Sequence, residues 1–159
     1  MLHIKIVCLG KLKEKYWQEA EVEYLKRLSA FAKVEILELK EESFDEKMPA
    51  QMIKEKEAQL LKNALNKFQD AFLIVLDEHG KQFSSVDFSQ KLSDLALDGN
   101  SNFVFVIGGP LGLDESVLKM AKLKLSFSSF TFTHQMIRVF LLEQIYRAMM
   151  IQAGRQYHY

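Results

Sequence analysis

The chain has 159 residues, 48% of them hydrophobic and 26% charged, which suits one globular domain with a sizeable core. Its one cysteine, Cys8, excludes an internal disulfide and lies in an apolar run, where we expect a core residue rather than a reactive thiol. No apolar run approaches the roughly 20 residues of a membrane span, and the first residues lack the pattern of a signal peptide. We therefore expect a cytoplasmic protein without a membrane partner.

Charge is balanced overall but uneven along the chain. Residues 1–115 carry a net charge of −5 and residues 116–159 carry +5, and three of the four arginines lie in the second segment. This asymmetry is compatible with a phosphate-binding face near the C-terminal end, and equally with a solvated basic surface.

Two hydrophobic patterns follow one another along the chain. Residues 3–9 alternate and then run apolar, as a buried strand does, and residues 11–31 repeat apolar positions every three or four residues, as an amphipathic helix does. Between the predicted strand 71–76 and the predicted helix 84–97, we expect the polar stretch after Leu76 to turn the chain. Asp77 and Glu78 are then expected to form the turn rather than to act in catalysis. The remaining predicted elements are, in order, strand 33–39, helix 51–65, strand 71–76, helix 84–97, strand 102–107, helix 114–121, strand 124–127 and helix 134–153.

The alternation of strands and helices predicts an α/β fold with a mainly parallel central sheet and helices on both faces, formed by residues 1–159 as one domain. Ligands of such sheets bind beyond the C-terminal ends of the strands. The candidate ligand positions therefore follow Leu9, Leu76, Ile107 and Phe127.

A glycine-bearing loop, "IGGPLGL", follows the strand at 102–107. It has neither the Gly-Lys-Ser/Thr of a P-loop nor the three-glycine fingerprint of dinucleotide-binding folds. Pro110 removes a backbone donor and Leu111 is apolar, which favours a ligand with a flat base over a phosphate. A tight turn without a ligand is the alternative, and Asp114 and Glu115 are expected to open the next helix.

Metal and hydrolytic chemistry have little support in the sequence. The four histidines show no paired ligand spacing, Cys8 has no cysteine partner, and no serine stands in a Gly-x-Ser-x-Gly setting. We predict no metal site.

The last helix and the segment before it are unusual. Small hydroxyl and aromatic residues fill positions 126–132, Thr133 is placed to cap the helix, and the helix is apolar on more than one side. Such a helix must be covered, either by a partner subunit or by the chain's own core.

Four segments together resemble one known family: "GKLKEKYW", "FVFVIGGPLGL", "LSFSSFTFTHQMIRVFLLEQIYRA" and "GRQYHY". They are similar, over essentially the whole chain, to the RlmH-type methyltransferases of the SPOUT class. The resemblance implies a homodimer with a trefoil knot in the C-terminal part of each chain, and S-adenosylmethionine as methyl donor. It implies methylation of N3 of a pseudouridine in large-subunit (23S) ribosomal RNA on the assembled ribosome.

The resemblance also implies site residues by position. The cofactor-binding residues would be Leu76, Gly108, Phe127, Ser128, Ser129, Phe130, Thr131 and Phe132. A pseudouridine N3 must lose its proton, so a nearby cation or donor that stabilises the anion helps the reaction. The catalytic candidates are His134, Arg138, Tyr157 and His158. Capping is the alternative for His134, and pairing with Glu143 across a dimer is the alternative for Arg138. Arg147 and Arg155 are expected to contact phosphates.

Two positions depart from the family pattern, Thr133 where the family has proline and Tyr159 where it has a basic residue. Two other functions compete with the enzyme: a ribosome-associated binding module without catalysis, and an oxidoreductase on a flavodoxin-like sheet. The intact cofactor positions disfavour the first, and the missing dinucleotide fingerprint disfavours the second.

Overall fold

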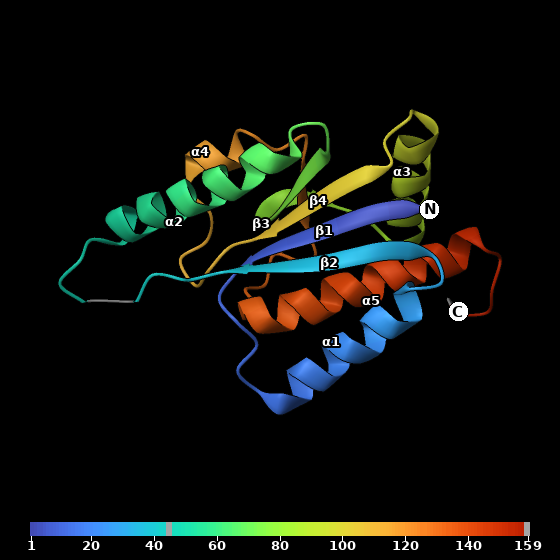
Figure 1. Cartoon of the computed structure of the whole chain (residues 1–159), viewed down its shortest axis with the longest axis horizontal. Helices are drawn as coiled ribbons and strands as arrows, with labels where there is room; N and C mark the ends of the chain where they lie inside the picture. Colours follow the sequence, from blue (N-terminus) through green and yellow to red (C-terminus); the bar gives the residue numbers. More distant parts are fainter. Residues whose placement is uncertain (44–45, 158–159) are drawn as a thin grey trace.

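The computed structural model of the chain, which describes residues 1–43 and 46–157, has one five-stranded sheet (Figure 1). Its strands lie in the order β2-β1-β4-β3-β5, and every neighbouring pair is parallel. The predicted parallel sheet is therefore confirmed. The elements are β1 (Leu2–Leu9), α1 (Lys15–Leu28), β2 (Ala32–Leu39), α2 (Ala50–Leu65), the 3-10 helix η1 (Asn66–Phe68), β3 (Phe72–Gln82), α3 (Ser85–Leu97), β4 (Asn102–Ile107), α4 (Glu115–Leu118), β5 (Leu123–Ser126) and α5 (His134–Gln152).

Helices cover both faces of the sheet. Helices α1, α3 and α5 lie on one face, and α2 and α4 lie on the other (Figure 1). The two apolar clusters divide neighbouring residues of a strand between them, with Phe105 under the first group of helices and Val106 under the second. This double cover explains why residues 103–107 form a continuous apolar run.

Helix α5 is covered largely by its own chain. It packs against α1 and α3, and eight of its residues are buried, although Phe140 remains 37% exposed. Burial in the chain's own core therefore accounts for most of its apolar character. Thr133 caps the helix as predicted, because its side chain accepts a hydrogen bond from the Met136 N–H at 3.3 Å. The homodimer stays a prediction.

The predicted turn after Leu76 is wrong, because β3 continues to Gln82. Leu76 and Lys81 both have Leu125 of β5 as their register partner, so residues 77–80 form a bulge rather than a turn. Gly80 allows this bulge: an added Cβ would lie 2.7 Å from the carbonyl carbon and oxygen of Lys124. The polar, glycine-containing sequence that indicated a turn therefore serves a close approach between two strands.

Substitution of Gly80 by alanine is expected to destabilise the protein. The new methyl group would press on the Lys124 backbone, which cannot move without disturbing β5, and overpacking of this kind costs about 1–3 kcal/mol. Urea denaturation followed by circular dichroism measures the free energy of unfolding. His79→Ala, at the exposed neighbouring position, is the control, and equal stability of the two variants would contradict a requirement for glycine at position 80.

Candidate functional site

Three segments predicted to bind the cofactor meet at one edge of the sheet. The strands β4, β3 and β5 are neighbours and parallel, so their C-terminal ends lie together. Gly108 directly follows β4, Leu76 pairs with Leu125 of β5, and Phe127 directly follows β5. The sheet therefore brings together residues that are up to 51 positions apart in the sequence.

The loop of residues 127–133, which we name the β5–α5 loop, is fastened to the bulge in β3. The Ser126 hydroxyl lies 3.0 Å from the carbonyl oxygens of both Glu78 and Ser128, and the Thr131 hydroxyl donates to the Glu78 carboxylate at 3.3 Å. The loop's own turn is held by the Phe130 N–H, which donates to the Ser128 hydroxyl. Sequence reasoning missed this role of Glu78 because it placed the residue in a turn.

Aromatic side chains of the β5–α5 loop form the wall of a recess of about 330 Å³. Phe132 stacks edge-on against Phe140 of α5, with ring centres 5.7 Å apart, whereas Phe130 is 78% exposed. The recess is lined by Phe83, Ser85, Phe127, Phe132, Phe140, Glu143 and Gln144. A second cavity, of about 280 Å³, lies at the opposite strand ends and includes none of the predicted site residues.

The glycine loop of residues 108–112 is tight on its inner side and open on its outer side. An added Cβ at Gly108 would lie 3.0 Å from Leu113, and one at Gly109 would lie 3.3 Å from both carboxylate oxygens of Glu57. Gly112 has φ +77°, and its added Cβ would meet no atom within 4 Å. Apolar rings, hydroxyls and a glycine backbone open on one side suit a nucleoside with an uncharged edge, such as the adenosyl group of the predicted cofactor.

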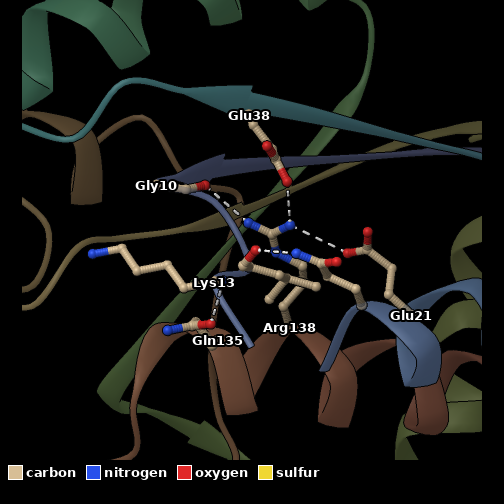
Figure 2. Close-up of polar contacts among 8 residues, drawn as sticks. Gly10, Lys13, Glu21, Glu38, Gln135 and Arg138 are labelled. Atoms are coloured by element: carbon tan, nitrogen blue, oxygen red, sulfur yellow. Dashed lines mark hydrogen bonds and ion pairs between the residues drawn. The ribbon is translucent and has the colours of Figure 1, made fainter. Parts of the chain in front are cut away.

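Arg138 is buried in an ion-pair network at the other end of the sheet edge (Figure 2). Its side chain is 1% exposed, and its guanidinium contacts Glu38 of β2 at 2.7 Å and Glu21 of α1 at 3.2 Å. It also donates to the Gly10 carbonyl oxygen at 3.0 Å. The arginine therefore ties α5 to α1 and to the ends of β1 and β2. Burial raises the pKa of Glu21, which the charge of Arg138 opposes.

Glu143 pairs with Arg147 of its own helix in this structure, and Arg138 is occupied by other carboxylates. The Glu143 carboxylate accepts hydrogen bonds from the Arg147 guanidinium at 2.6 and 3.0 Å. The pairing of Arg138 with Glu143 that the sequence suggested runs across a dimer, so it stays a prediction.

His134 begins α5 beside the Arg138 network. Its Nε2 atom lies 4.0 Å from the Glu41 carboxylate, and Lys13 and Gln135 join the two segments through a hydrogen bond of 2.8 Å between the Lys13 N–H and the Gln135 side chain (Figure 2). Burial lowers the pKa of His134, the charges of Arg138 and Lys13 add to this, and Glu41 opposes it. The imidazole is therefore neutral near pH 7. His134 is not the helix cap, because Thr133 has that role.

Tyr157 folds back against the C-terminal half of α5. Its hydroxyl donates to Glu143 at 3.2 Å, its ring centre lies 4.9 Å from that of Tyr146, and the Arg147 guanidinium lies 4.7 Å from its ring. Burial, with hydrogen bonds to Tyr24 and Glu143, raises the pKa of Tyr157 above its ordinary value. His158, the fourth catalytic candidate, lies outside the described residues.

The catalytic candidates do not converge within one chain. His134 begins α5 and Tyr157 follows its end, and a helix of 19 residues is roughly 28 Å long. His134 and Arg138 of one chain therefore lie near the ends of β1 and β2, far from Tyr157 of the same chain.

The described part of the chain offers neither a metal-binding cluster, nor a membrane-spanning helix, nor a reactive thiol. Residues 1–43 and 46–157 contain no cluster of three histidine, cysteine or acidic side chains that would hold a metal ion. Within the same ranges, no helix has the length and apolar character to span a membrane. Cys8 is buried, as predicted for a core residue, and burial raises the pKa of its thiol to about 12.

One buried acid that sequence reasoning missed is Glu57 of α2, which is 3% exposed. The sequence spacing does indicate that Glu57 is buried: it stands four residues after Ile53 and four before Leu61, on the apolar face of the helix.

Comparison with known proteins decides the family. A model described as "Predicted SPOUT methyltransferase" matches residues 2–158. The chain belongs to this family. S-adenosylmethionine is accordingly its methyl donor, and the likeness of its segments to RlmH-type methyltransferases is confirmed.

Relatives of the same length carry one name, ribosomal RNA large subunit methyltransferase H. The protein of Pelotomaculum thermopropionicum is 47% identical, with both chains covered in full. That of Streptococcus suis is 44% identical, with 99% of each chain covered.

Solved structures of low sequence identity share the fold. A probable methylase family protein of Haemophilus influenzae has a TM-score of 0.59 at 12% identity, and the alignment covers 98% of this chain and 70% of that one. A tRNA (m1G37) methyltransferase of Aquifex aeolicus has a TM-score of 0.55 at 12% identity, with 92% and 69% covered. These likenesses show that the fold is shared, and the family model supplies the SPOUT assignment.

Removal of the buried guanidinium is expected to destabilise the fold. Arg138→Gln leaves Glu21 and Glu38 facing one another without a cation, and breaking such a buried pair costs about 3 kcal/mol in the free energy of unfolding. Adding Glu38→Gln removes one stranded charge, so the double variant should regain part of the loss. Denaturant unfolding measures both, and additive effects of the two substitutions would contradict the ion pair.

The pKa of His134 is expected to lie below the ordinary value of 6.5. Its contribution to stability is therefore present above pH 6.5 and is lost as the pH falls through the lowered pKa of the folded state. Titration of the imidazole resonances by NMR, with His134→Asn to assign the signal, measures it. A pKa above 6.5 would mean that Glu41 outweighs burial.

Proposed function

We propose that this chain is an S-adenosylmethionine-dependent methyltransferase of large-subunit ribosomal RNA, acting on N3 of a pseudouridine. The observation that carries the proposal is the full-length identity of 44–47% with proteins named ribosomal RNA large subunit methyltransferase H. The position of the methylated atom rests on the resemblance of the C-terminal segments to the RlmH type.

The cofactor site that we propose consists of Leu76, Gly108 and Phe127–Phe132. Its support is the meeting of β4, β3 and β5 at one edge, with the β5–α5 loop held by Ser126 and Glu78. When bound, the cofactor supplies a methyl group on a sulfonium. The chain's part is to hold that group in line with the acceptor and to exclude water from it, with the phenyl rings as apolar cover.

We further propose that the site is completed by a second copy of the chain in a homodimer. The support is the separation of the candidates along α5: Tyr157 lies far from His134 of its own chain, so a second chain must supply one of the two if they share a site. The same proposal includes a trefoil knot in the C-terminal part of each chain, as the resemblance to the RlmH type implies.

Loss of the proton from N3 of the pseudouridine calls for a cationic or hydrogen-bond-donating group nearby. The neutral imidazole of His134 suits a hydrogen-bonding role better than a charged one.

Arg138 has a positioning role in this proposal and does not touch the substrate. Its guanidinium is buried and paired with Glu21 and Glu38, so it holds α5 against α1 and the ends of β1 and β2. Tyr157 and His158 keep the proposed catalytic role near the pseudouridine. Arg147 and Arg155 keep their proposed role of contacting phosphate groups of the RNA. The protein would act on assembled ribosomes in the cytoplasm.

Methyl transfer to ribosomes tests the proposed function. The purified protein is incubated with tritiated S-adenosylmethionine and with either assembled ribosomes or free large subunits from cells that lack the modification. We expect label in the RNA of the assembled ribosomes and at least about tenfold less in the free subunits, because the assembled particle provides the complete acceptor surface. Nuclease digestion and mass spectrometry then locate the methyl group.

Other outcomes separate the competing functions. Label at another atom would overturn the N3 assignment while leaving the methyltransferase intact. Cofactor binding in calorimetry with no label on either substrate would leave a binding module. Absence of cofactor binding would remove the methyltransferase proposal.

A further inference from the structure

Glu57 occupies a position where a charged side chain is costly. It lies on the buried face of α2, between Ile53 and Leu61, and is itself 3% exposed. A buried carboxyl group lowers stability unless its oxygens find hydrogen-bonding partners. Of its two oxygens, Oε1 accepts a hydrogen bond of 3.2 Å from the Glu42 N–H, and Oε2 has no partner within the described residues. An apolar residue would serve the core better, so this side chain requires another explanation.

The glycine loop lies directly against this carboxyl group. A Cβ added at Gly109 would lie 3.3 Å from both oxygens of Glu57, which is closer than most real contacts of a Cβ atom. The loop itself is closed by a 3.0 Å hydrogen bond from the Gly112 N–H to the Gly109 carbonyl oxygen. Glu57 thus meets the loop where it leaves β4, immediately after Gly108, the residue proposed to approach the cofactor most closely.

The surroundings of Glu57 make its carboxyl group easier to protonate than an exposed one. Burial raises its pKa above the ordinary value of 4.5, and the nearby charges of Glu41 and Glu42 add to this, while the Glu42 N–H opposes it. Glutamine has nearly the same shape and keeps a side-chain oxygen that can accept the hydrogen bond from the Glu42 N–H, which makes Glu57→Gln the matched substitution.

We propose that Glu57 is a positioning residue for cofactor binding: its carboxyl group, held by the Glu42 N–H after β2, supports the glycine loop from the α2 side. This inference rests on the proposed function, because it takes residues 108–112 as one wall of the cofactor site. Glu57 does not touch the cofactor in this role. Its carboxyl group stands behind Gly109, where even an added Cβ would lie 3.3 Å from both oxygens, and the hydrogen bond from the Glu42 N–H holds it there, so it limits how far Gly108 and Gly109 can shift toward α2.

Calorimetry with S-adenosylmethionine on four proteins tests the inference. Glu57→Ala is expected to weaken cofactor binding about tenfold, a loss equivalent to about 1.4 kcal/mol. Glu57→Gln should bind within about twofold of the natural protein, since it keeps the hydrogen-bonding group. Leu61→Ala, one turn along the same buried face, is the control for mere destabilisation, and should lower Tm without changing Kd.

A double-mutant cycle sharpens the test of direct contact. Gly109→Ala alone should weaken binding, because its Cβ presses on the carboxyl oxygens. In the Glu57→Ala background the same substitution has space, so its additional effect should be small. Additive losses would show that Glu57 and Gly109 act separately, which contradicts the proposal.

Hydrogen exchange in the cofactor-free protein gives a readout that does not depend on binding. The Gly112 amide should exchange faster in Glu57→Ala than in Glu57→Gln or Leu61→Ala, because only the first loosens the loop. Unchanged exchange and unchanged Kd in Glu57→Ala would overturn the inference. If the natural protein binds no cofactor, the proposed function fails, and faster exchange in Glu57→Ala alone would still support the loop contact.

Discussion

The parallel pairing of β4, β3 and β5 is the constraint on which the cofactor site depends. Because all three strands run the same way, their ends lie at one edge, and the glycine loop, Leu76 and the β5–α5 loop become neighbours. The bulge at residues 77–80 lets β3 stay paired with β5 beyond Leu76 and presents Glu78 to the loop. Helix α5 then begins where that loop ends.

The two ends of this edge serve different purposes. At the β1 and β2 end, buried Arg138 joins three elements through Glu21, Glu38 and the Gly10 carbonyl group. At the β4, β3 and β5 end, hydroxyl and backbone hydrogen bonds surround apolar rings, and the Glu78 carboxylate accepts a hydrogen bond from the Thr131 hydroxyl. A buried ionic network thus lies where three elements must be held together, and apolar rings with hydroxyl groups lie where we propose that the cofactor binds. Glu57 stands between the two, behind the glycine loop.

Much of the fold follows from local sequence. Strands and helices were predicted in the right order, and Thr133 was identified as a cap from its position alone. The exception was the stretch after Leu76, where polar residues and Gly80 indicate a turn by local preference. Pairing with β5 overrides this preference, and no local signal reveals a partner strand more than 40 residues away. The assignment of Arg138 to catalysis rested on its apolar helix and its family position, and its carboxylate partners come from two distant elements.

By itself the sequence determined the class of fold, the family, and the segments of the proposed cofactor site. Hydrophobic periodicity and motifs involve residues close together in the sequence, so both can be recognised without a structure. Only the tertiary structure decided what those residues touch. Arg138 is buried in ion pairs, His134 lies beside Glu41 and Gly10, and Glu57 lies behind the glycine loop, since burial and charge depend on neighbours that the sequence keeps far apart. Helix length separates Tyr157 from His134, because the 19 residues of α5 hold its two ends apart.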